Sequence, residues 1–131
     1  MEDMTDIRFT PNDEWVRLEG DKIRVGISDF AQGRLGDIVH VDLPEPDDHH
    51  YEPDEDAGVV ESLSGSIEFH APLAGMITAI NSNLLSNPEL VSADPYGDGW
   101  LVEMKPDDIS GYDELLDVNE YESGLPEEDE E

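Results

Sequence analysis

Cysteine is absent from the 131 residues and basic residues are scarce, with six lysines and arginines against 35 aspartates and glutamates, a formal charge of −29. The absence of cysteine excludes disulfides, thiolate zinc sites and cysteine nucleophiles. So negative a chain repels phosphate backbones, which excludes nucleic-acid binding. The charge favours protein partners with basic surfaces, and an acidic proteome from a saline habitat is the alternative reason for it.

Long hydrophobic runs are also missing. No apolar run approaches the roughly 18 residues that a membrane span needs. The first ten residues contain acids where a signal peptide has a basic region and an apolar stretch. We therefore expect a cytoplasmic, soluble protein that does not bind membranes. The length corresponds to one ordinary domain, which we expect to be monomeric.

The apolar residues that are present come in short runs divided by turn residues, about 8 to 12 residues apart, as in all-β sandwiches and barrels. Ser28 is a helix N-cap and Gly36 a helix end, which predicts a short helix over 29–35. A second helix, or a pair of helical turns, is expected over 112–124. The predicted domain spans 9–124, between a flexible N-terminus (1–8) and a disordered acidic tail (125–131). Strands are expected at 23–27, 38–43, 58–63, 66–70, 76–80 and 100–105.

A hairpin is predicted where Ser64-Gly65 joins the strands 58–63 and 66–70. Glycine supplies the positive φ that the primed turns of tight hairpins require, so Gly65 explains the turn. The segment before the hairpin, 44–57, is dense in acidic residues and proline, which predicts a loop.

Histidines and carboxylates in the loop invite a metal interpretation, since Asp47 and Asp48 precede His49 and His50. Adjacent histidines in an extended segment point to opposite sides, and no well-spaced third ligand is visible. The prediction is therefore no metal, with His49 and His50 as weak candidates.

Glu61 and Glu68 flank the hairpin and could form a carboxylate pair for acid–base catalysis. A protruding hairpin lacks the cleft that such chemistry needs, so no catalytic residue and no enzyme activity are predicted. We expect His40 and His70 to be surface or half-buried packing residues.

Several segments, taken in order, resemble the H protein of the glycine cleavage system. The resemblance covers about Phe9 to Tyr121. It rests on Asp13-Glu14-Trp15-Val16, Val25-Gly26-Ile27-Ser28-Asp29-Phe30-Ala31-Gln32, Leu35-Gly36-Asp37-Ile38-Val39, Leu43-Pro44-Glu45, Gly58-Val59-Val60-Glu61-Ser62, Ala71-Pro72-Leu73-Ala74-Gly75, Pro88-Glu89-Leu90-Val91, Asp94-Pro95-Tyr96-Gly97-Asp98-Gly99-Trp100-Leu101 and Glu114-Leu115-Leu116.

The resemblance implies an all-β fold with minor α, a lipoyl-domain-like barrel-sandwich hybrid of two antiparallel layers with a C-terminal helix. It also implies a carrier lysine at the hairpin tip. In the family that lysine bears lipoate, which moves an aminomethyl group from a pyridoxal-phosphate decarboxylase to a tetrahydrofolate-dependent aminomethyltransferase. A flavin dehydrogenase then reoxidises the arm.

This chain differs from the family at the position of the carrier lysine. Family members have Glu-Ser-Val-Lys-Ala here, whereas this chain has Glu61, Ser62, Leu63, Ser64 and Gly65, so Ser64 takes the lysine position. Lipoylation forms an amide and needs a primary amine, while a serine hydroxyl is a weak nucleophile without a base. No cofactor is therefore predicted.

Two functions remain open. The first is a non-lipoylated interaction, scaffold or regulatory domain that contacts glycine-cleavage or lipoate-handling enzymes. The second is an ordinary H protein carrying the lipoyl-bound aminomethyl group, either through Lys22 or Lys105, the only lysines, or because the natural chain differs at position 64.

Overall fold

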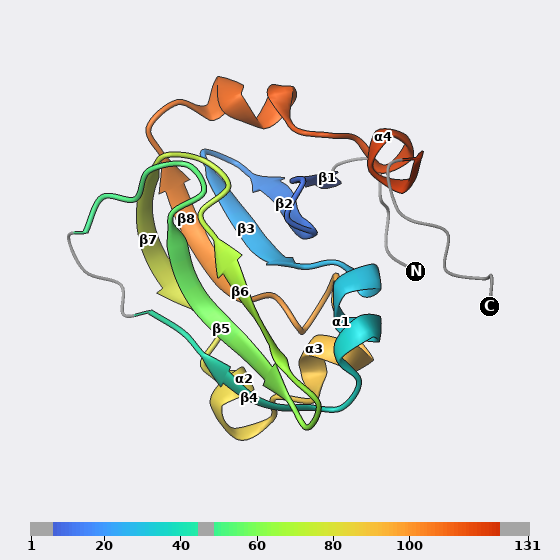
Figure 1. The fold of residues 1–131 in the computed structure, drawn as a ribbon. Coiled ribbons are helices and arrows are strands. Elements are labelled where there is room, and N and C mark those ends of the chain that lie inside the picture. The colour runs from blue at the N-terminus through green and yellow to red at the C-terminus, as the bar shows by residue number, and fades with distance from the viewer. Residues whose placement is uncertain (1–6, 45–48, 124–131) are drawn as a thin grey trace.

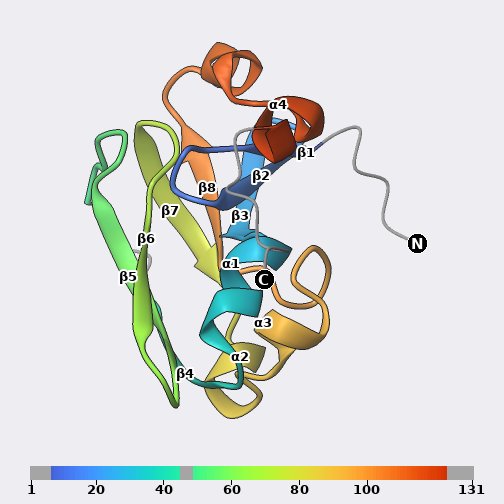
Figure 2. The ribbon, with the colours of Figure 1, turned by 45° about the vertical axis from the view of Figure 1, so that its right-hand side comes forward.

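Two antiparallel sheets face each other in the computed structural model, which describes residues 7–44 and 49–123 (Figures 1 and 2). The larger sheet has the order β1-β2-β3-β8-β7 and the smaller the order β4-β5-β6. All pairs are antiparallel. The strands are β1 (Ile7–Phe9), β2 (Glu14–Glu19), β3 (Lys22–Ile27), β4 (Ile38–Asp42), β5 (Asp56–Ser62), β6 (Ser66–His70), β7 (Gly75–Ile80) and β8 (Val102–Pro106).

The core lies between the two sheets, where the inward side chains of both meet. Val16, Val25 and Met104 from the larger sheet and Val60 and Phe69 from the smaller one are all fully buried in a single cluster. In β8, buried positions recur at every second residue, as the two-residue period of a strand requires, while β2 and β3 also bury consecutive residues. The prediction of an all-β fold in two antiparallel layers is therefore confirmed.

Helix α1 (Asp29–Leu35) crosses from the larger sheet to the smaller one and has the predicted bounds. The Ser28 hydroxyl accepts a hydrogen bond from the Ala31 backbone N–H at 3.1 Å, which is the expected N-cap. The helix ends at Gly36, whose φ of 83° favours glycine. The other helical segments are α2 (Asn83–Ser86), α3 (Leu90–Ala93), the 3₁₀ helix η2 (Ile109–Glu114) and α4 (Val118–Ser123).

Several boundaries differ from the sequence prediction, most of the strand ends by one or two residues. Ile7 and Arg8, assigned to a flexible N-terminus, lie in β1, where Ile7 is buried. Strand β5 begins at Asp56, which lies inside the segment predicted as a loop, because Asp56 pairs with His70 of β6. At the C-terminal side, the alternative of two helical turns is the one found, as η2 and α4, although η2 begins at Ile109, three residues before the predicted start at 112. The predicted tail, 125–131, lies outside the described residues.

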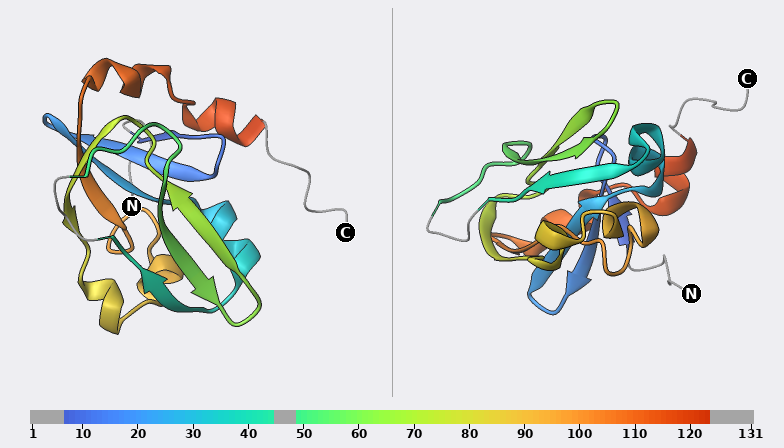
Figure 3. Two further views of the ribbon diagram at one scale, coloured as in Figure 1. Left: turned by 60° about the vertical axis from the view of Figure 1, so that its left-hand side comes forward. Right: turned by 90° about the horizontal axis from the view of Figure 1, so that it is seen from below.

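Strand β1 and the C-terminal part of the described residues meet at the edge of the larger sheet. Phe9 and Leu116 exchange two backbone hydrogen bonds, of 2.7 and 2.9 Å, so the C-terminal segment covers the outer edge of β1. The Phe9 and Tyr121 rings stack with centroids 4.3 Å apart. Figure 3 shows α4 lying beside the N-terminal strands. No helix in 7–44 or 49–123 has the length and apolar character to cross a bilayer.

Candidate functional site

The hairpin of β5 and β6 carries the candidate site at its tip, between Ser62 and Ser66. The two strands pair from Asp56 opposite His70 to Glu61 opposite Ser66. Four residues, 62–65, lie between the members of this last pair, and Leu63 among them is 81% exposed. The predicted solvent-facing hairpin is therefore present.

The Ser62 hydroxyl organises the turn. It accepts hydrogen bonds from the backbone N–H groups of Ser64 (3.2 Å) and Gly65 (3.1 Å), while the Ser62 N–H donates to the Gly65 carbonyl at 2.7 Å. Gly65 does not have the positive φ that we expected, since the positive-φ glycines among the described residues are Gly20, Gly36 and Gly75. That explanation of the turn was wrong, because a serine side chain replaces the primed-turn geometry.

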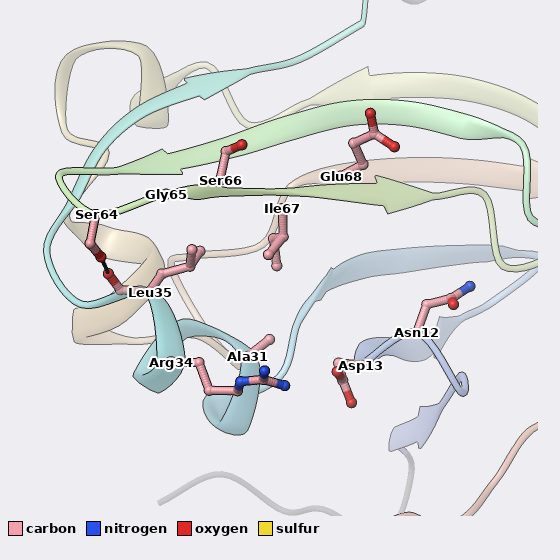
Figure 4. A pocket seen from close by; sticks show the side chains of 10 residues that line it. All are labelled: Asn12, Asp13, Ala31, Arg34, Leu35, Ser64, Gly65, Ser66, Ile67 and Glu68. Atoms are coloured by element: carbon pink, nitrogen blue, oxygen red, sulfur yellow. Dashed lines mark hydrogen bonds between the residues drawn. The ribbon is translucent and has the colours of Figure 1, made fainter.

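Ser64 fastens the tip to α1. Its Oγ donates a hydrogen bond to the Leu35 carbonyl at 3.0 Å, drawn as the dashed line in Figure 4. Leu35 is the last residue of α1, and the final carbonyls of a helix have no partner within it. The Ser64 hydroxyl thus supplies a donor to a helix end and holds the tip against the end of α1.

A cavity of about 330 Å³ opens between the hairpin and α1. Ser64 and Ile67 line it on the hairpin side, with Ala31 and Arg34 opposite (Figure 4). Ile67 points toward α1, while Ser66 and Glu68 point to the other face of β6. The far end is formed by Asn12 and Asp13, in the turn between β1 and β2. The cavity can hold a small molecule or a flexible side chain.

Asp13 is held in place by a hydrogen bond from Tyr121 of helix α4. The Tyr121 hydroxyl donates to Asp13 Oδ1 at 2.8 Å and lies 2.7 Å from Ser28 Oγ. Burial raises the pKa of Tyr121 above its ordinary value, so the hydroxyl keeps its proton and remains a donor. Asp13 itself has a φ of 69°, which is an uncommon conformation for a residue with a side chain.

Next to this cavity, buried Glu14 joins the two layers through His70. Glu14 Oε2 accepts from the His70 backbone N–H at 2.6 Å and lies 2.8 Å from His70 Nδ1, while Thr10 Oγ1 donates to Oε1 at 2.9 Å. Desolvation raises the pKa of Glu14, and the hydrogen bonds from His70 and Thr10 act against that rise. The sequence analysis missed the role of Glu14, since 56 positions separate it from His70.

The other predicted candidates do not converge. His49 contacts Glu55 at 2.6 Å, and His50 contacts Asp107 at 2.5 Å, so each has its own carboxylate partner. Glu61 lies opposite Ser66 and Glu68 opposite Val59 on the two arms of the hairpin. Trp15 is fully buried, and its Nε1 donates to the Pro95 carbonyl at 2.8 Å.

Comparison with known proteins gives the family. A family model described as "Glycine cleavage H-protein" matches residues 7–128. The chain belongs to this family. The H protein of Acinetobacter baylyi is 43% identical over 121 residues, covering 92% of this chain and 97% of that protein. The H protein of Halalkalibacterium halodurans is 43% identical over 123 residues, covering 94% and 95%. A solved H protein from Mycobacterium marinum matches with a TM-score of 0.81 and 35% identity, covering 92% and 98%.

Lipoate, the group that an H protein is expected to carry, does not fit at the hairpin tip of this member. Ser64 offers a hydroxyl whose neighbours are the Leu35 carbonyl and, at 3.4 Å, Ser62 Oγ, and neither is a base. The two lysines lie in the other sheet, Lys22 in β3 and Lys105 in β8, and Lys105 is paired with Asp21 at 2.8 Å.

Removing the Ser64 hydroxyl should loosen the tip measurably. Ser64→Ala loses the hydrogen bond to Leu35, which we expect to lower the free energy of unfolding by about 1 kcal/mol. Urea denaturation followed by circular dichroism measures the change. Ser66→Ala, at the exposed start of β6, is the matched control and should stay within about 0.5 kcal/mol of the parent. Equal stability of Ser64→Ala and the parent would show that the contact contributes nothing.

Proposed function

We propose that this H-protein family member is a non-catalytic, non-lipoylated interaction domain that acts as a scaffold or regulator of glycine-cleavage or lipoate-handling enzymes in the cytoplasm. The observation that carries the proposal is the serine at the tip of the hairpin. A swinging carrier needs a primary amine on a long flexible stem. Ser64 has neither, and its hydroxyl is engaged with α1.

What remains at the tip is suited to contact with a protein. Leu63 is 81% exposed there, which is unusual for a leucine, and the chain carries a formal charge of −29. Such a surface attracts partners with basic faces and accelerates their association, while an exposed apolar side chain at the contact contributes by burial. We therefore propose that the tip enters the interface and that the acidic surface steers the partner to it.

The interaction is tested by capture of glycine-cleavage enzymes on the immobilised chain. We expect binding at about 0.15 M salt that is weakened at about 1 M, where charges are screened beyond about 3 Å. Leu63→Ser should weaken capture, while Leu85→Ser, at another exposed leucine (60%), should not. Capture that is insensitive to both salt and Leu63→Ser would refute this interface.

The second candidate function is an ordinary carrier, favoured by the full-length match to H proteins. It requires an amide on Lys22 or Lys105. Incubation of the wild-type chain with lipoate ligase, lipoate and ATP, followed by intact-mass measurement, distinguishes the two functions. We expect no adduct, with a lipoyl-accepting H protein as positive control. An adduct mapped to either lysine would establish the carrier and end the non-lipoylated proposal.

A further inference from the structure

We propose that His70, Asp56 and Glu68 form a binding site for a divalent transition-metal ion such as Zn²⁺, on the outer face of the β5–β6 hairpin. One ligand atom from each of the three lies within 4.8 Å of the others. The site is independent of the function of Ser64.

The register of the hairpin brings the three side chains together. Glu68 and His70 are two positions apart in β6, so they share one face of the strand, and Asp56 in β5 pairs directly with His70. Figure 4 shows Glu68 on the face of β6 that points away from α1. All three ligands therefore come from two adjacent strands, a rigid base for a metal site.

Glu14, which is not itself one of the three ligands, holds the His70 imidazole in position. His70 Nδ1 lies 2.8 Å from Glu14 Oε2, and an ionised Glu14 carboxylate would accept a hydrogen bond from this nitrogen. The Glu14 side chain is only 1% exposed, and Thr10 and the His70 N–H hold it in place. A buried carboxylate on the second nitrogen is the arrangement that orients metal-binding histidines and makes them more basic.

The remaining nitrogen faces the carboxylates. His70 Nε2 lies 3.2 Å from Asp56 Oδ1. Two ligand atoms bound to one tetrahedral Zn²⁺ at about 2.0–2.2 Å are themselves about 3.4 Å apart. The His70 and Asp56 atoms thus already have the separation that a shared ion requires. Glu68 is exposed, and its ligand oxygen lies within 4.8 Å of the other two ligand atoms.

The ligand set favours a borderline ion over a hard one. Imidazole suits Zn²⁺, Ni²⁺ and Cu²⁺, whereas Mg²⁺ and Ca²⁺ prefer sites made of oxygen alone. An ion here would bridge β5 and β6 and, through His70 and Glu14, connect the smaller sheet to β2 of the larger one. It would stabilise the hairpin that carries Ser64.

The test is calorimetric titration of the full chain with Zn²⁺ at about 1 M sodium chloride, which suppresses diffuse binding to the acidic surface. We expect one saturable equivalent and no comparable binding of Mg²⁺. Glu68→Gln and Asp56→Asn should each weaken Zn²⁺ binding by at least about 10- to 100-fold. Loss of a residue that only hydrogen-bonds to a metal ligand already has an effect of that size. Both positions are exposed, so neither variant should unfold the chain.

Two controls locate the ion. Glu89→Gln removes the same charge from an exposed position on the other side of the fold and should leave the affinity unchanged. The double variant His49→Asn/His50→Asn removes both imidazoles of the acidic segment 44–57. It should also retain Zn²⁺ binding. In ¹⁵N NMR of the imidazoles, Zn²⁺ should shift the His70 Nε2 resonance and leave that of His40 in place.

Three results would overturn the site. They are unchanged affinity in both Glu68→Gln and Asp56→Asn, equal weakening in Glu89→Gln, and loss of binding in the His49→Asn/His50→Asn variant.

Discussion

Ser64→Lys is expected to convert the chain from one that accepts no lipoate into one that accepts a single lipoyl group. The substitution places a primary amine on a four-carbon stem at a tip that is already exposed and already has the register of a hairpin. Lipoate ligase with lipoate and ATP should then give one stoichiometric adduct by intact mass. The parent chain, treated in the same way, should remain unmodified.

A lysine elsewhere on the same hairpin separates the effect of position from the effect of a new amine. Ser66→Lys adds the same group two residues further along, at the exposed start of β6, and should stay unmodified. If Ser64→Lys also takes no lipoate, the surface that the ligase recognises has been lost together with the amine. Modification of both variants would mean that any exposed lysine on this hairpin suffices.

Gly26→Ala is expected to cause a large loss of stability in the larger sheet. A Cβ at Gly26 would lie 2.5 Å from Trp15 Nε1 and 2.6 Å from Trp15 Cε2. Trp15 is fully buried and tied to the Pro95 carbonyl, so the ring cannot withdraw without losing that bond. Overpacking of this kind costs about 3 kcal/mol, measurable as a lower midpoint in urea.

The same substitution at Gly33 should change the stability of the protein in the opposite direction. Gly33 lies inside α1, and a Cβ there meets nothing within 4 Å. Because alanine restricts the unfolded chain and favours the helix, Gly33→Ala should stabilise the protein by up to about 1 kcal/mol. A loss at Gly26 no greater than the change at Gly33 would contradict the close packing of Trp15 against β3.

The local features of the fold were predictable from the sequence. Helix α1 has the expected bounds because both its ends are encoded by single residues, Ser28 and Gly36, that act on their own neighbours. The hairpin was found for the same reason, since alternation and a break at the tip are visible within a dozen residues. The short helix α3 was not predicted, because four residues are too few for a periodic pattern.

The contacts between distant segments could not be predicted in this way. The pairing of buried Glu14 with His70 depends on how β6 lies across the start of β2, and nothing local in either segment encodes it. The bond from Ser64 to the end of α1 likewise depends on the placement of the hairpin tip, 29 positions further along the chain. Sequence reasoning therefore identified the unusual residue at the site but not the partner that holds it.

The pairing of Phe9 with Leu116 also affects how the protein is made. On the ribosome, the first strand emerges long before the segment that completes its hydrogen bonds. Until the segment around Leu116 emerges, β1 presents an open edge, and open edges template association between nascent chains. The dense negative charge of the polypeptide then has a use during synthesis, because neighbouring chains on one polysome repel each other while that edge is uncovered.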